Sequence, residues 1–150
     1  MHTRSALTTA AIRPRFNTVA ALLLSLACQV SGAQQVITNE DLDCGVLTRN
    51  QARLFFTMRL PTCPNGQSVK VFVLPDDDPL HAEFVKTVLG LFPYQLRQVW
   101  DRQVFSGTGQ APITVRNEQE MIERVATTPG AIGYAAGKPA EPGIKLLEVR

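Results

Sequence analysis

The segment that most constrains the fold of this 150-residue chain is the apolar run Val69–Leu74, written VKVFVL. Five of its six residues are apolar, so both faces of the strand that it predicts must be covered by other parts of the protein. Strands of this kind lie inside covered, largely parallel sheets, whereas the strands of a half-exposed hairpin alternate between apolar and polar residues. The run therefore favours a sheet with helices on both faces.

Helices are predicted on both sides of this strand along the sequence. Thr48, with Gln51 three residues on, has the capping-box arrangement and begins one helix. Asp78 and Pro79 suit the cap and the first position of a second helix, whose apolar residues recur every four positions until Gly90 stops it.

Two further helices follow. The third spans 94–104 and buries Trp100, and the fourth begins at Asn117 and ends at the pair Pro129 and Gly130. Proline cannot continue a helix, and glycine adopts the left-handed conformation that closes one. Other strands are expected at 36–38, 131–134 and 144–149. Strands that alternate with helices through short connections predict an α/β fold with a mainly parallel sheet flanked by helices.

The first 33 residues have the pattern of a secretory signal peptide. A basic start without acidic residues leads into an apolar run, Val19–Val30, and small residues up to Ala33 suit cleavage there. The protein is therefore expected to be periplasmic or secreted. Residues 34–150 would remain as one domain with no stable membrane span after processing.

Two other interpretations of this segment stay open. An uncleaved membrane anchor is one, although the apolar run is short for a membrane span. Lipidation at Cys28 is the other, although Ser25 stands where a lipid-attachment motif usually has leucine.

Processing also changes the charge of the chain. The full chain has 15 basic and 13 acidic residues, but Arg4, Arg13 and Arg15 lie in the signal, so that 12 basic and 13 acidic residues remain. A mature chain of this charge, without a basic run interleaved with aromatic residues, indicates no nucleic-acid partner.

Two cysteines remain after cleavage, Cys44 and Cys63. In an exported chain an even number of cysteines favours a disulfide over free thiols. On the chain-entropy model, closing a loop of about 20 residues stabilises a fold by about 3 kcal/mol. No metal site is indicated, because there is no Cys-x-x-Cys pair and His81 is the one histidine left after processing.

Several short motifs follow one another in a distinctive order: Leu47-Thr48, Phe55-Phe56, Pro64-Asn65-Gly66-Gln67, the segment 84–90, Trp100, Phe105-Ser106-Gly107 with Gly109, and the segment 129–134. This order resembles one lobe of the phosphate-type, type II periplasmic solute-binding proteins of ABC transporters. The last motif, Pro-Gly-Ala-Ile-Gly-Tyr, is the most specific. The resemblance covers about residues 36–137 and implies a small oxyanion or another small solute as ligand, without a cofactor.

Two departures from this family are visible. The first is size, because solute-binding proteins clamp a ligand between two lobes, and the mature chain is long enough for only one. A single lobe offers half of a cleft, so a protein partner or a homodimer is an open expectation.

The second departure is the ligand loop. In phosphate binders of this family the strand equivalent to Val69–Leu74 is followed by an arginine and a Ser-Gly-Thr run that suit an oxyanion. Here Asp76, Asp77 and Asp78 follow, and Pro79 removes a backbone N–H. At about 4 Å and an effective dielectric constant of about 20, each carboxylate would oppose a phosphate by about 4 kcal/mol before screening. Tight phosphate binding is therefore not expected.

The acidic run allows three interpretations. It caps a helix and complements its dipole, it forms a docking surface for a basic partner, or Asp77 and Asp78 hold a cation or an amine. Elsewhere, Ser106 and Thr108 lie in a glycine-rich loop that either cradles an anion or is a plain turn after a helix.

Three further residues have both a structural and a functional interpretation. Tyr134 either belongs to the fold or presents its hydroxyl at a strand end, where ligands gather in α/β sheets. His81 is expected to be an exposed surface histidine, and Trp100 is expected to lie in the core.

Catalysis is not indicated, because one mature histidine cannot complete a Ser-His-Asp or Cys-His set. The leading hypothesis is an exported, solute-binding-like module that does not bind phosphate tightly. The alternative is a protein-interaction or accessory domain that kept the fold and lost the ligand.

Overall fold

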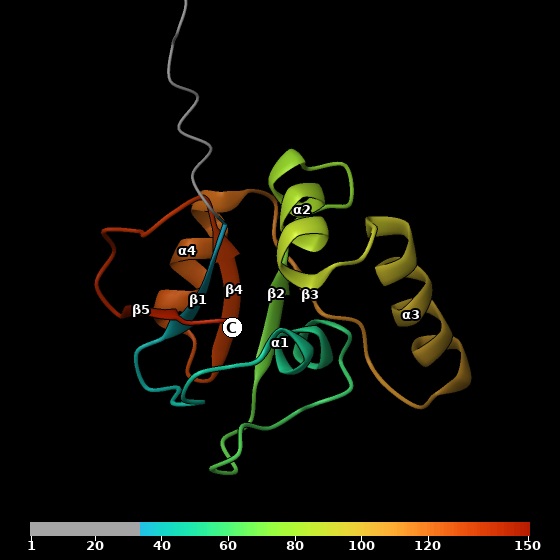
Figure 1. Ribbon diagram of the computed structural model, residues 1–150, viewed down its shortest axis with the longest axis horizontal. Coiled ribbons are helices and arrows are strands. Elements are labelled where there is room, and N and C mark those ends of the chain that lie inside the picture. Colours follow the sequence, from blue (N-terminus) through green and yellow to red (C-terminus); the bar gives the residue numbers. More distant parts are fainter. Residues whose placement is uncertain (1–33) are drawn as a thin grey trace, which may run out of the picture. The chain divides into compact units, whose positions relative to one another are not determined.

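The computed structural model describes residues 34–150, and the predicted signal peptide, its cleavage site and Cys28 lie outside the described residues. In chain order the elements are β1 (Gln35–Asn39), α1 (Arg49–Phe56), β2 (Lys70–Val73), α2 (Pro79–Phe84), the π-helix η1 (Val85–Leu89), α3 (Pro93–Ser106), β3 (Ile113–Thr114), α4 (Glu118–Thr127), β4 (Ala131–Ala135) and β5 (Ile144–Leu147). The predicted α/β class is confirmed (Figure 1).

The five strands form one sheet in the order β3-β2-β4-β1-β5. β2 runs parallel to β3 and β4, as expected for the apolar run, whereas β1 runs antiparallel to β4 and β5. The sheet is thus mixed rather than mainly parallel. Apolar periodicity identifies strands but does not determine the direction of β1, which depends on pairing with residues far along the chain, such as Val36 with Tyr134.

Helices cover both faces of β4. Successive side chains of a strand point to opposite faces, so Gly133 and Tyr134 show what lies on each face. On one face, Tyr134 packs against Phe56 of α1 and is stacked on Phe84 of α2, with ring centroids 5.9 and 4.0 Å apart. On the other face, Gly133 lies against α4, where a Cβ would come within 2.5 Å of the Met121 sulfur. Figure 1 shows α4 on one side of the sheet and α1 and α2 on the other.

The core forms around these contacts. Phe72 and Val73 of β2 are fully buried, in agreement with the prediction that both faces of this strand are covered. Trp100 of α3 is buried as expected, and its indole N–H donates to the carbonyl oxygen of Phe56 at 2.8 Å.

The predicted helix starts are confirmed. Thr48 and Gln51 form the capping box of α1, and the Asn117 side chain accepts the N–H of Glu120 at 2.9 Å to cap α4. Helix ends are less well predicted. For example, α3 continues to Ser106, two residues beyond the expected end.

The turn from α4 into β4 is as predicted. Gly130 has a φ of +77° between the end of α4 and the start of β4. A Cβ at this position would collide with the carbonyl oxygen of Ser68, so both the backbone conformation and the available space require glycine.

The predicted disulfide is present between Cys44 and Cys63, whose Cα atoms are 5.0 Å apart. A hydrogen bond of 2.8 Å from the Asn65 side chain to the carbonyl oxygen of Asp43 joins the same two loops. Between residues 34 and 150, no helix has both the length and the apolar character needed to cross a bilayer.

Candidate functional site

The loop between β2 and α2 carries the acidic residues on which the site prediction depends. Asp78 is the N-cap of α2, and its Oδ1 accepts the N–H groups of Leu80 at 2.8 Å and His81 at 3.4 Å. The carboxylate of Asp78 therefore takes the backbone donors at the start of this helix that an external anion would otherwise use. Asp77 is exposed and makes no hydrogen bond or ion pair within residues 34–150.

Asp76 is paired with an arginine from a distant helix. Arg97 of α3 donates through Nε and Nη2 to the two carboxylate oxygens of Asp76, each at 2.8 Å. The guanidinium also lies 5.0 Å from the centre of the Trp100 ring. These hydrogen bonds from Arg97 lower the pKa of Asp76, so the carboxylate stays ionised and the pair holds α3 against the loop.

The prediction that His81 is an exposed surface histidine is wrong. His81 is fully buried beneath the loop, and its Nδ1 lies 2.6 Å from the Tyr134 hydroxyl. That hydroxyl accepts the N–H of Leu74 at 2.8 Å, so its single hydrogen is available for Nδ1, and the remaining imidazole proton belongs on Nε2. Nε2 lies 3.9 Å from Asp76 and makes no hydrogen bond within residues 34–150.

Burial sets the protonation state of His81. Desolvation lowers its pKa below the ordinary value of 6.5, and Asp76 and Asp78 only partly oppose this effect. Arg97 acts in the same direction as burial. His81 is therefore neutral at neutral pH and serves to position Tyr134.

The structure does not place the Tyr134 hydroxyl at an open strand end. The side chain is fully buried, and both hydrogen bonds of its hydroxyl, to Leu74 and His81, are internal. Burial raises the pKa of Tyr134 above its ordinary value, which is consistent with a neutral phenol. In this arrangement Tyr134 links β4, β2 and α2.

Ser106 and Thr108 lie at the other end of α3. Ser106 is the last residue of the helix, its hydroxyl lies 2.7 Å from the carbonyl oxygen of Arg102, and its Oγ is 2.8 Å from that of Thr108. Gly107 between them has a φ of +68° and closes the helix. Ser106 is nine residues beyond Arg97, or about 13 Å along the helix. The structure therefore does not bring these hydroxyls to the β2–α2 loop.

The geometry of the loop favours structure over ligand binding. The carboxylates of Asp78 and Asp76 are used for a cap and an ion pair, and Asp77 alone cannot form a cation cage. Within residues 34–150 there is no group of three or more His, Cys, Asp or Glu residues that could hold a metal ion. Arg97 was not predicted from the sequence. It lies 21 positions after Asp76 and reaches that residue only because α3 packs against the loop.

Comparison with solved structures relates this geometry to known proteins. An ABC-type phosphate transport receptor from Vibrio cholerae matches with a TM-score of 0.59 at 12% identity, over 77% of this chain and 45% of that chain. PstS from Borrelia burgdorferi matches with a TM-score of 0.59 at 14% identity, over 78% and 47%. A protein described as a phosphate ABC transporter substrate-binding protein, with bound phosphate, from Clostridium perfringens matches with a TM-score of 0.59 at 14% identity, over 77% and 44%.

The chain has the fold of one lobe of these proteins. It spans less than half the length of each of them, which agrees with the single-lobe prediction. At these identities the likeness concerns the fold, and the resemblance predicted from the sequence motifs is confirmed at that level. No protein-family model and no curated protein sequence matches the chain.

Proposed function

We propose that this chain is an exported accessory module that keeps the fold of a solute-binding lobe and works through contact with a protein partner. In this proposal it neither captures phosphate tightly at the β2–α2 loop nor catalyses a reaction. Of the two hypotheses raised by the sequence, this is the one that the loop geometry favours.

The proposal depends on one observation about the β2–α2 loop. The hydrogen-bond donors that an oxyanion would use there are already bound by carboxylates of the protein. Asp78 takes the N–H groups at the start of α2, and Asp76 takes two donors of Arg97. A phosphate would have to displace these carboxylates and approach their negative charges.

A protein partner is supported by aromatic side chains exposed on and just before α3. Phe92 and Tyr94 are 51% and 62% exposed and their rings stack 5.9 Å apart, while Phe105 at the other end of the helix is 88% exposed. Exposed aromatic residues are enriched at protein interfaces, because they bury a large area at a low entropic cost. The disulfide is consistent with export to an oxidising compartment.

A photo-crosslinking experiment tests the proposal. A photoactivatable phenylalanine analogue would be placed at Tyr94 or Phe105 in the cells that make the protein, with Arg59, which is also exposed, as the control position. We expect a discrete crosslinked product from at least one α3 position and none from Arg59. The mass of the product distinguishes a homodimer from another partner. Absence of a product at both α3 positions would refute the proposal.

A further inference from the structure

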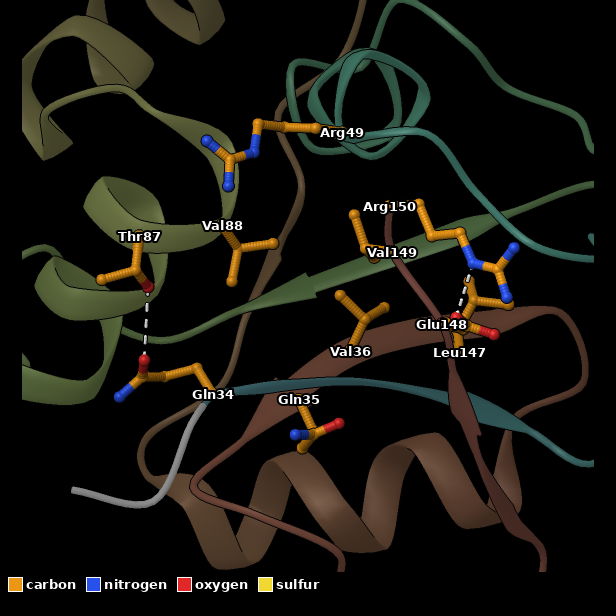
Figure 2. A pocket seen from close by; sticks show the side chains of 10 residues that line it. All are labelled: Gln34, Gln35, Val36, Arg49, Thr87, Val88, Leu147, Glu148, Val149 and Arg150. Atoms are coloured by element: carbon orange, nitrogen blue, oxygen red, sulfur yellow. Dashed lines mark hydrogen bonds and ion pairs between the residues drawn. The ribbon is translucent and has the colours of Figure 1, made fainter. Parts of the chain in front are cut away.

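A pocket lies apart from the β2–α2 loop, on the face of the sheet that α1 and η1 only partly cover. It has a volume of about 250 Å³ and is lined by four segments: 34–36, Arg49, 87–88 and 147–150 (Figure 2). None of the residues 76–81 contributes to it.

One wall of the pocket is held by backbone hydrogen bonds. The N–H of Leu47 donates to the carbonyl of Glu148 at 3.0 Å, and the N–H of Arg150 donates to the carbonyl of Leu47 at 2.8 Å. The N–H of Arg49 donates to the main-chain oxygen of Arg150 at 2.8 Å. These three hydrogen bonds join the start of α1 to the segment after β5, and the two segments together form this wall.

Four apolar side chains lie in the inner part of the pocket, and the other six residues of its lining are polar or charged. Val36 and Leu147 are 2% and 7% exposed and face the same side of the sheet, since they are paired across β1 and β5. Val88 and Val149 are partly buried against the core beside them. Hydrocarbon placed on these side chains would be removed from water, which favours binding by about 25 cal/mol per Å² of apolar area.

The rim of the pocket carries a cation without an ionic partner. Glu148 and Arg150 neutralise each other through a contact of 2.6 Å between Oε1 and Nε. Arg49 makes no ion pair within residues 34–150, and Figure 2 shows its side chain extending from α1 toward Val88. On the opposite wall, the hydroxyl of Thr87 lies 3.2 Å from Oε1 of Gln34.

We propose that this pocket binds a small organic carboxylate. The carboxylate group pairs with the guanidinium of Arg49, which offers two parallel N–H donors, and the hydrocarbon part lies on Val36, Val88 and Val149. The volume corresponds to about eight water molecules, which suits a short aliphatic or small aromatic acid. Free phosphate is expected to bind less well, because it has no hydrocarbon part to place on these side chains and gains only the pairing with Arg49.

Ligand-observed NMR and thermal-shift measurements on the purified protein test this inference with butyrate, benzoate and inorganic phosphate as probes. Arg49→Gln removes the charge at an exposed helix position, and Arg59→Gln is the matched control at an exposed arginine outside the pocket. We expect at least one carboxylate to bind in the millimolar range or tighter. Arg49→Gln should weaken that binding by about tenfold or more, and Arg59→Gln should leave it unchanged.

The inference would be overturned if neither carboxylate binds, if Arg49→Gln binds as the parent does, or if phosphate binds as well as the carboxylates. Melting without ligand reports whether Arg49→Gln is folded, and if it is not, competition between butyrate and benzoate on the parent protein decides the question. Two acids that bind without competing would also overturn a shared site. The inference does not depend on the proposed protein partner, since crosslinking at α3 and carboxylate binding at Arg49 are separate measurements.

Discussion

At the scale of single residues, positions 130 and 133 require glycine for two different reasons. Gly130 needs its positive φ and has the Ser68 carbonyl against it, whereas Gly133 has an ordinary φ but lies against Met121 of α4. Both were predictable from the local pattern, because a Pro-Gly pair after a helix indicates a left-handed turn and a glycine inside an apolar strand indicates a close neighbour. Gly107, predicted to lie in a plain loop, also has a positive φ because it closes α3.

Gly130→Val is expected to lower the free energy of unfolding by about 1–3 kcal/mol, through backbone strain and the contact with Ser68. For a domain of this size the melting temperature should fall by several degrees. Gly107→Val should cost less, because no atom lies within 4 Å of its Cβ position and only the strain remains. Calorimetric melting of both variants shows which of them is destabilised more. A larger loss of stability in Gly107→Val than in Gly130→Val would contradict the account.

His81 and Tyr134 show what local pattern cannot predict about single residues. The stripe of apolar residues on α2 does not include His81, and its burial depends on Tyr134, 53 positions away. A polar side chain that is buried through one distant hydrogen bond carries no periodic signal in the sequence.

The buried His81 predicts a dependence of stability on pH. The pKa of His81 in the folded protein lies below the ordinary value of 6.5. As the pH falls from about 6.5 toward that lower pKa, His81 takes up a proton in the unfolded chain but not in the folded chain. Stability is therefore fully present above that window and decreases within it. Denaturant unfolding should show that the free energy of unfolding falls between about pH 7 and about pH 5, and that it falls less in His81→Gln than in the parent protein. Equal losses in the parent and the variant would count against this role of His81.

At the scale of helices and strands, local chemistry determined most of what was predictable. The caps at Thr48, Asp78 and Asn117 each need only a side chain and the N–H groups of the next turn, so sequence spacing reveals them. The π-helical turn η1 and the antiparallel direction of β1 were not predicted, since both depend on how elements pack after they form.

Asp78→Ala tests the cap of α2. Loss of the hydrogen bonds to Leu80 and His81 should lower the free energy of unfolding by about 1 kcal/mol. Asp77→Ala is the matched control, because Asp77 is adjacent and exposed, and it should change stability by less than about 0.5 kcal/mol. Chemical denaturation compares the two variants, and similar effects would mean that the acidic run acts only through its total charge.

For the molecule as a whole, the sequence predicted a single lobe and its disulfide but not the arrangement of its polar groups. The sequence offered Ser106, Thr108, Asp77, Asp78 and Tyr134 as candidate ligand residues. In the structure Ser106 and Thr108 lie at the far end of α3, and Asp78 and Tyr134 make internal hydrogen bonds. Arg97, which completes the loop, reaches Asp76 only in the folded protein.

The disulfide predicts the thiol content of residues 34–150. Because Cys44 and Cys63 are bonded, titration under denaturing, non-reducing conditions should find no free thiol from these two residues. After reduction the melting temperature should fall, since about 3 kcal/mol of loop-closure stabilisation is lost. Two titratable thiols from Cys44 and Cys63 before reduction would show that the bond does not form.

The most direct test of the central claim is calorimetric titration of inorganic phosphate into the purified protein at neutral pH. We expect no saturable binding in the micromolar range, because Asp76 and Asp78 already occupy the donors of the β2–α2 loop. Asp77→Ala should behave like the parent, since its carboxylate takes no part in closing the loop. A micromolar or tighter affinity of the parent protein for phosphate would contradict the claim that this loop is closed to an oxyanion.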